Sequence, residues 1–219
     1  MNFNDKELLN KGLEQLGFSC IEISDRIEKY IKEIELFNTA YSLVKVNNSR
    51  DFIIKHIFDS LTPLKEITYN LEKKYISAPW KIADVGSGAG LPGIPLSIVL
   101  SSSEFTLIER MKRRAGFLQN CKAVLGLKNV DIEEIEMELA APGRFDLVVL
   151  RAFHPIEPLM LKNLLRLIKP NGFLGAWKGR YEIAKREISG LKNAMEIIPI
   201  KVPFLNEQRC LALCQNDMF

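Results

Sequence analysis

Residues that bind transition metals are scarce in this sequence. Its 219 residues include four cysteines and only two histidines. No two of the cysteines form a C-x-x-C pair, so the ligand spacing of a structural zinc site is missing. We expect buried free thiols and no bound metal. The four cysteines are Cys20, Cys121, Cys210 and Cys214.

Long apolar runs and a strong charge of either sign are also absent. No apolar run reaches the roughly 18 residues that suggest a membrane span, and the first ten residues are too polar for a signal peptide. The net charge is only +3, which does not by itself indicate a polyanionic partner. We therefore expect a cytoplasmic globular protein that binds no membrane. The charge is unevenly spread, however, since four of the five residues from Arg110 to Arg114 are basic.

The first 75 residues have the periodicity of helices, and we treat 1–75 as an N-terminal helical region. Asn4 and Glu7 have the spacing of a capping box before a first apolar stripe. Ser24 or Asp25 can cap a second helix, and residues 50–61 form a third amphipathic candidate.

From Trp80 onward, short apolar runs alternate with longer amphipathic segments, and we treat 76–219 as a second domain. Such β–α alternation predicts an α/β fold with a mostly parallel sheet covered on both faces. The strand candidates are Ile82–Val85, Phe105–Glu109, Val130–Ile135, Phe145–Leu150, Phe173–Trp177 and Arg209–Cys214. The intervening helix candidates are Gly93–Leu100, Arg113–Leu125, Pro158–Ile168 and Tyr181–Leu191, and "APGRF" and "KPNGF" are predicted turns.

A glycine-rich loop follows the first strand candidate, where open α/β sheets bind their ligands. Its sequence "DVGSGAGLPG" places Gly86, Gly88 and Gly90 at alternate positions after Asp84. A nicotinamide fingerprint, G-x-G-x-x-G, requires glycine where this chain has Leu91, so a dinucleotide oxidoreductase is disfavoured. The G-x-G-x-G spacing instead resembles the first motif of class I S-adenosylmethionine-dependent methyltransferases.

Carboxylates and a methionine at later strand ends extend the candidate site. Glu109 ends the second strand about 20 residues after the loop, where a carboxylate can accept hydrogen bonds from ribose hydroxyls. After the third strand, Met137 can lie against an adenine and Glu138 can accept a proton from its amine, although plain packing explains Met137 equally well. Arg151 ends the fourth strand.

Five longer segments together resemble the RsmG family, also called GidB, of bacterial methyltransferases that modify N7 of a guanine in the decoding-region loop of 16S ribosomal RNA. The segments occur in the family's order and span roughly residues 37–214. They are "HIFDSL" (56–61), "DVGSGAGLPGIPLSIV" (84–99), "KRRAGFL" (112–118), "FDLVVLRAF" (145–153) and "LGAWKG" (174–179).

The resemblance implies a class I methyltransferase fold, with a Rossmann-like seven-stranded sheet whose last strand is antiparallel, and S-adenosyl-L-methionine as the cofactor. It also implies the cofactor contacts Gly86, Leu91, Met137, Glu138 and Arg151, with Glu109 at the ribose. Many members have aspartate at that last position, so the glutamate adds a methylene.

Guanine N7 already carries an in-plane lone pair, so its methylation needs no general base and depends largely on alignment. We therefore expect Arg151 to act by positioning, on the cofactor carboxylate, a phosphate or guanine O6, and to leave N7 free. Phe153 can stack on an extruded base, and a core phenylalanine is equally compatible. His154 is more simply structural or RNA-contacting than an acid or base. Structural and site-wall roles are equally open for His56 in "HIFDSL" and for its neighbours Asp59 and Ser60.

Basic side chains supply the phosphate contacts that RNA binding requires. Without the resemblance, the basic run would be interpreted as a solvated helix face. The alternatives are a methyltransferase for another RNA or a small molecule, and a non-catalytic RNA-binding assembly factor. We expect 16S rRNA or the 30S subunit as partner, no DNA partner and a monomeric enzyme. The RNA-binding candidates are Lys112, Arg113, Arg114, Phe153, His154, Lys178, Arg180 and Arg209.

Overall fold

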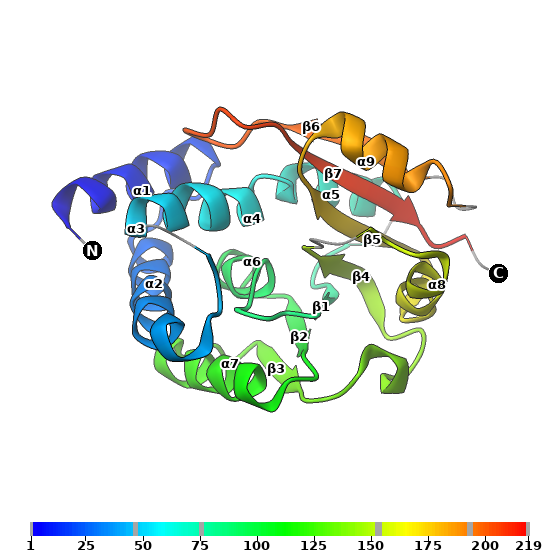
Figure 1. The fold of residues 1–219 in the computed structure, drawn as a ribbon, viewed down its shortest axis with the longest axis horizontal. Coiled ribbons are helices and arrows are strands. Elements are labelled where there is room, and N and C mark those ends of the chain that lie inside the picture. Colours follow the sequence, from blue (N-terminus) through cyan, green and yellow to red (C-terminus); the bar gives the residue numbers. More distant parts are fainter. Residues whose placement is uncertain (1, 46–47, 75–76, 152–154, 192–194, 218–219) are drawn as a thin grey trace.

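The computed structural model describes residues 2–45, 48–74, 77–151, 155–191 and 195–217. They form a seven-stranded sheet in the order β3-β2-β1-β4-β5-β7-β6 (Figure 1). The first five strands are parallel, and β7 is antiparallel to both β5 and β6. The predicted fold class and the antiparallel last strand are confirmed. The strands are β1 (Lys81–Val85), β2 (Glu104–Ile108), β3 (Val130–Glu133), β4 (Phe145–Leu150), β5 (Ile168–Lys178), β6 (Glu196–Ile200) and β7 (Arg209–Gln215).

Helices cover both faces of this sheet. One hydrophobic cluster joins the N-terminal helices, α6 and α7 to one face, and a second joins α8 and α9 to the other. Figure 1 shows α1, α2 and α7 on the left of the view and α8 and α9 on the right. The helices are α1 (Phe3–Gln15), α2 (Ile21–Tyr41), α3 (Ser49–Phe52), α4 (Asp59–Leu61), α5 (Leu64–Lys73), α6 (Gly93–Val99), α7 (Lys112–Leu125), α8 (Pro158–Arg166) and α9 (Tyr181–Ile188), with a π-helix η1 (Ile53–Phe58) and a 3-10 turn η2 (Met137–Leu139).

The N-terminal helices share their core with the sheet. Ile31 of α2 and Phe58 of η1 are fully buried in the cluster that also contains Ile82 and Leu107 of the sheet. The helices α1 to α5 therefore extend the core of the sheet, with no hydrophobic interior of their own.

Several local expectations were wrong. Asn2, not Asn4, caps α1, because its side chain accepts a hydrogen bond from the Asp5 amide at 2.9 Å. The second helix begins at Ile21, after Cys20, which makes no side-chain cap. The turn predicted at "KPNGF" lies within β5, where Asn171 has a φ of 66° and the pairing with β4 shifts register.

Strand β6 had no counterpart among the predicted strands. It lies at the sheet edge, pairs only with β7 and contains Pro199. Proline is tolerated in an edge strand because its missing N–H leaves no ladder bond unmade. Within the described parts of the chain, no helix is both long and apolar enough to cross a bilayer.

Candidate active site

The glycine loop turns sharply between β1 and α6. Gly86, Gly88 and Gly90 have φ values of 69°, 58° and 89°, a region that side chains strongly disfavour. A Cβ at Gly93, where α6 begins, would lie 2.6 Å from the Asp84 Oδ2. The first three glycines therefore permit the sharp turn, and Gly93 permits the close approach of α6 to β1. Leu91 is buried at the end of the turn.

Asp84 holds the two ends of this loop together. Its Oδ2 accepts hydrogen bonds from the Ser87 hydroxyl at 2.6 Å and the Gly93 amide at 2.9 Å. Burial raises the pKa of Asp84 to about 6, although these two hydrogen bonds lower it. Because the side chain is fully buried, Asp84 acts on the site through the conformation of the loop.

Glu109 connects the same loop to the end of β2. Its Oε2 accepts from the Gly88 amide at 2.9 Å and its Oε1 from the Met111 amide at 2.8 Å. The side chain is almost completely buried, so the additional methylene lets the carboxylate reach back under the loop. Each carboxylate oxygen has two acceptor sites, so these bonds leave capacity for a ligand hydroxyl.

An open pocket of about 380 Å³ lies beside Glu109 and is lined by Arg110, Met111, Glu134, Ile135, Glu136 and Leu139. The predicted adenine pair does not line it. Met137 and Glu138 form the η2 turn, where Met137 packs against the core beneath α8 and the exposed Glu138 accepts a hydrogen bond from Asn163 at 3.3 Å. The pocket is lined instead by the three residues before that pair, by Leu139 after it, and by Arg110 and Met111.

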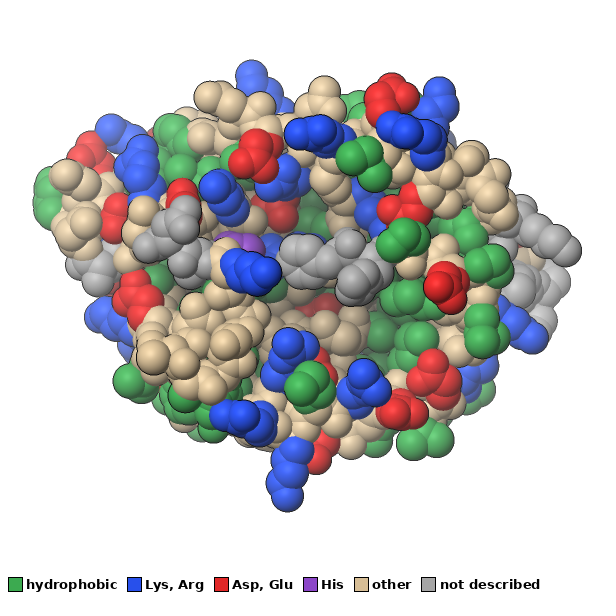
Figure 2. Space-filling model, in the orientation of Figure 1, with side chains coloured by type: hydrophobic (Ala, Val, Ile, Leu, Met, Phe, Trp, Pro, Cys, Tyr) green, Lys and Arg blue, Asp and Glu red, His purple; other side chains and the backbone are tan. Residues whose placement is uncertain are grey.

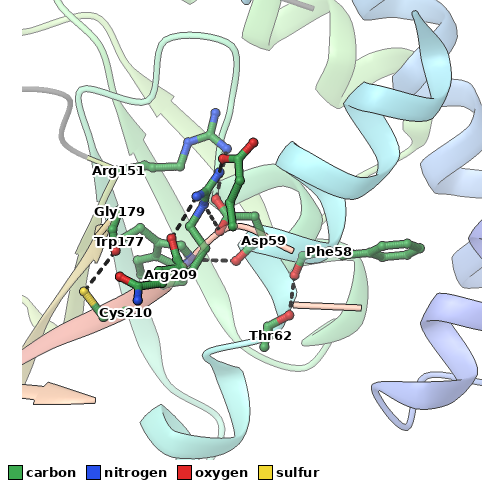
Figure 3. Close-up of polar contacts among 10 residues, drawn as sticks. Phe58, Asp59, Thr62, Arg151, Trp177, Gly179, Arg209 and Cys210 are labelled. Carbon is green, nitrogen blue, oxygen red and sulfur yellow. Dashed lines mark hydrogen bonds and ion pairs between the residues drawn. The ribbon is translucent and has the colours of Figure 1, made fainter. Parts of the chain in front are cut away.

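Arg151 follows the last residue of β4 and belongs to a buried ionic cluster (Figure 3). Its Nη1 lies 3.7 Å from Asp59 Oδ2, and the Arg209 Nε lies 3.3 Å from Asp59 Oδ1. The side chains of Arg151 and Asp59 are only 11% and 8% exposed. Burial raises the pKa of Asp59, against the opposing effect of both arginines, and burial lowers the pKa of Arg151. Trp177 fixes the other side of Asp59 by donating from its indole Nε1 to the Asp59 carbonyl at 2.9 Å.

Tyr30 connects α2 to the glycine loop, a contact that sequence reasoning missed. Its hydroxyl donates to the Ala89 carbonyl at 2.6 Å, and its side chain is fully buried. In the sequence Tyr30 is one member of an apolar stripe. The only available signal was a single hydroxyl in that stripe.

His56 lies in η1 and is kept neutral. Burial, followed by the charge of Arg151, lowers the pKa of its imidazole to about 3. Its Nδ1 has no hydrogen-bond partner within the described part of the chain, and the same is true of the fully buried Ser60 hydroxyl. At this pKa the imidazole carries a single N–H near pH 7 and is too weak a base to take up a second proton. In the described ranges, no cluster of three or more His, Cys, Asp or Glu side chains is arranged to hold a metal ion.

The predicted RNA-binding residues fall into four groups, the last of which is buried Lys178. Lys112, Arg113 and Arg180 are exposed and Arg114 is half-buried, and Figure 2 shows Lys and Arg side chains around the hollow at the centre of this face. Arg113 stacks on the Tyr41 ring and donates to the Ala40 carbonyl. The Arg209 guanidinium is bound to Asp59, Glu207 and the Gln208 carbonyl. Phe153 and His154 lie outside the described residues.

Lys178, the remaining predicted RNA contact, is buried. Its side chain is 4% exposed and forms an ion pair and hydrogen bond with Glu187 of α9. Side chains alternate between the two faces of a strand, and Trp177 lies in the cluster with the N-terminal helices, so Lys178 at the end of β5 points to the face that α9 covers. Its contact with RNA stays a prediction, and this burial and ion pair argue against it.

Comparison with known proteins connects these features to one family. The family model described as "rRNA small subunit methyltransferase G" (GidB) matches residues 23–212. The chain is 36% identical over 238 residues to a ribosomal RNA small subunit methyltransferase G from Treponema denticola, covering 95% of this chain and 94% of the relative. It is 37% identical over 180 residues to the protein of the same name from Borreliella burgdorferi, covering 80% and 81% of the two chains.

A solved structure with a similar fold is the 1,6-didemethyltoxoflavin-N1-methyltransferase of Burkholderia thailandensis with bound 1,6-didemethyltoxoflavin and S-adenosylhomocysteine. The TM-score is 0.54 at 13% identity, and the match covers 86% of this chain and 89% of the other. At this identity the likeness concerns the fold alone.

Proposed function

The chain belongs to the family rRNA small subunit methyltransferase G, a family of methyltransferases that act on RNA of the small ribosomal subunit, and from this premise we propose its donor, its acceptor atom and its site residues. The donor is S-adenosylmethionine. The acceptor is N7 of a guanine in the decoding-region loop of 16S rRNA, in the 30S subunit or a precursor of it. The enzyme acts as a monomer in the cytoplasm, where this substrate is found.

The residues at the carboxyl edge of the sheet fit this cofactor. Gly86, Gly88, Gly90 and Leu91 form the turn that would hold its amino-acid end. Glu109 retains acceptor capacity for the ribose hydroxyls. The adjoining pocket, with the apolar side chains of Met111 and Ile135, would hold the adenine. When bound, the cofactor supplies an electrophilic methyl group on a sulfonium. The Burkholderia enzyme, named with bound S-adenosylhomocysteine, shows only that a protein with this fold can hold the demethylated cofactor.

Positioning by Arg151 replaces acid–base chemistry at this site. The observation that carries the proposal is that Arg151 emerges at the same sheet edge as the glycine loop and Glu109. Guanine N7 has no proton to lose, so attack on the methyl group requires alignment and no general base. The low pKa of His56, about 3, agrees with this chemistry, because an imidazole that is neutral at pH 7 and this weakly basic is neither a general acid nor an effective general base. Arg151 would contact O6, a phosphate or the cofactor carboxylate and leave the N7 lone pair free.

Lys112, Arg113, Arg114 and Arg180 are the candidates for phosphate contacts, because they combine positive charge with at least partial exposure. Phe153 and His154 follow Arg151 in the chain and stay predicted RNA contacts, Phe153 by stacking on an extruded base. Arg209 is a weaker candidate, since three protein groups already bind its guanidinium.

The proposal is tested by transfer of tritiated methyl from S-adenosylmethionine to purified 30S subunits from a strain that lacks this modification. Nuclease mapping and mass spectrometry then identify the labelled nucleotide. Label recovered as 7-methylguanosine in the decoding-region loop supports donor, acceptor and substrate together. Arg151→Lys keeps the positive charge but removes the guanidinium fork, and it should lose transfer or cofactor affinity.

Absence of label, despite measurable cofactor binding, would reject the mature 30S subunit as substrate. Assembly intermediates and naked 16S rRNA would then be tested in the same assay. Label on a different atom or a different RNA would reject guanine N7.

A further inference from the structure

Asp59 lies directly after a rare helical form. Residues 53–58 form the π-helix η1, and α4 begins at Asp59. Single π turns are uncommon and are concentrated at functional sites. The wider turn ends at an aspartate whose side chain points into the candidate site, beside Arg151 (Figure 3).

Three side chains from separate strands hold Asp59 in place. Arg151 follows β4, Arg209 begins β7, and Trp177 lies near the end of β5. The two arginines face different carboxylate oxygens, at 3.7 and 3.3 Å, and the Trp177 indole binds the Asp59 carbonyl at 2.9 Å. Asp59 therefore couples the end of β4 to the antiparallel half of the sheet.

The position of the Arg151 guanidinium depends on this carboxylate. A charge this deeply buried is costly unless an opposite charge is fixed beside it. If Asp59 lost its charge, the Arg151 guanidinium would lose the ion pair that holds it at the end of β4.

We propose that Asp59 is a positioning residue for methyl transfer, which acts by holding the Arg151 guanidinium at the carboxyl end of β4. The inference rests on the proposed function, since it assigns Asp59 to the same site. Arg209 and Trp177 have the supporting task of fixing Asp59. In this role Asp59 acts through Arg151 and needs no contact of its own with cofactor or RNA.

The variant Asp59→Asn tests the proposal because it keeps the size of the side chain and removes its charge. Displacement of a substrate-positioning group by about 1 Å can cost on the order of 10²-fold in rate. We expect a fall of that order in kcat for methylation of 30S subunits, with folded protein retained by circular dichroism. The matched control is Asp146→Asn, at the opposite end of β4, where Asp146 pairs with Lys169 at 2.8 Å. That variant should lower thermal stability and keep kcat.

A double-mutant cycle separates positioning from general support of the fold. If Asp59 acts through Arg151, the double variant Asp59→Asn with Arg151→Lys should lose no more than the worse single variant, within about twofold. Losses that multiply would mean that Asp59 acts independently of Arg151, and the proposal would fail. It would fail equally if Asp59→Asn kept full kcat.

Asp59→Glu covers the case in which Asp59→Asn does not fold. It keeps both ion pairs possible but moves the carboxylate by one methylene, so its kcat should fall between those of wild type and Arg151→Lys. Wild-type kcat in Asp59→Glu would overturn the proposal. Wild-type enzyme that binds S-adenosylmethionine but labels no RNA would instead overturn the proposed function, which keeps the two failures distinct.

Discussion

Replacing Tyr30 by phenylalanine removes one hydroxyl from the core and leaves the Ala89 carbonyl without its donor. The hydrogen bond is 2.6 Å long and is shielded from solvent. Ala89 lies between Gly88 and Gly90, so this bond ties helix α2 to the middle of the glycine loop. Under the proposed function, that loop holds the cofactor.

The expected magnitude follows from the unsatisfied carbonyl. A buried acceptor without a partner costs about 1–3 kcal/mol. The glycine-rich loop can relieve most of that cost by turning the carbonyl toward water, which takes the loop out of its binding conformation. Ligand affinity then falls in proportion to the population of the competent loop. A shift of about 1–2 kcal/mol corresponds to a dissociation constant for S-adenosylmethionine that is about 5- to 30-fold larger.

Isothermal titration calorimetry measures the affinity for S-adenosylmethionine, and thermal unfolding without ligand measures the stability of the fold. Together they show in which of the two quantities the cost of the unsatisfied carbonyl appears. Tyr41→Phe is the matched control, because Tyr41 ends the same helix and contacts Arg113 and Phe37 through its ring. We expect unchanged cofactor affinity for that control. If Tyr30→Phe lowered the melting temperature by several degrees, at about 2–4 °C per kcal/mol, but left the dissociation constant within twofold of wild type, the loop would not depend on α2 and the reasoning would be refuted.

Three further predictions concern pH, a buried ion pair and RNA affinity. The pKa of His56 is about 3 in the folded protein and about 6.5 in the unfolded chain. Below about pH 6.5 the unfolded chain therefore binds a proton that the folded protein does not, and wild type should lose stability as pH drops from 7 to 4. His56→Gln should flatten that decline in denaturant titrations, and an unchanged slope would contradict the burial argument. Lys178→Ala leaves the half-buried Glu187 carboxylate without its cationic partner and should destabilise the fold by about 3 kcal/mol. RNA affinity should be unchanged at temperatures where the variant is folded, and an RNA defect without a stability defect would support Lys178 as an RNA contact. Replacing Lys112 and Arg113 by alanine should weaken RNA binding in filter assays and reduce the salt slope by about 0.7 for each phosphate that is no longer neutralised, whereas a slope equal to wild type would place the phosphates elsewhere.

The sequence predicted those parts of the fold that depend on local patterns. Five of the six predicted strands lie close to observed ones. Four of these five are parallel strands, which are buried on both faces and therefore appear in the sequence as short apolar runs between turn residues. The run beginning at Phe173 found only the end of β5, since the residues "KPNG" resemble a turn. Edge strand β6 contains a proline and carries too weak a pattern to be separated from a loop.

Side-chain environments depend on distant segments and could not be predicted in the same way. Lys178 and Arg180 belong to one short basic stretch, yet Lys178 is buried against α9 and Arg180 is exposed. For Asp59 the sequence left a structural role and a site-wall role equally open. Its contacts come from residues 92, 118 and 150 positions further along the chain, so no local spacing records them.

Helices α1 to α5 share one core with the sheet. Mutations in these helices should therefore impair methylation, although the helices contribute no catalytic group. Packing defects in α1 or η1 displace α2, and α2 holds the glycine loop through Tyr30. A selection for cells that have lost the modification will therefore return substitutions throughout the N-terminal helices as well as at the end of β4. The distance of such a position from the methyl group is a poor guide to its effect.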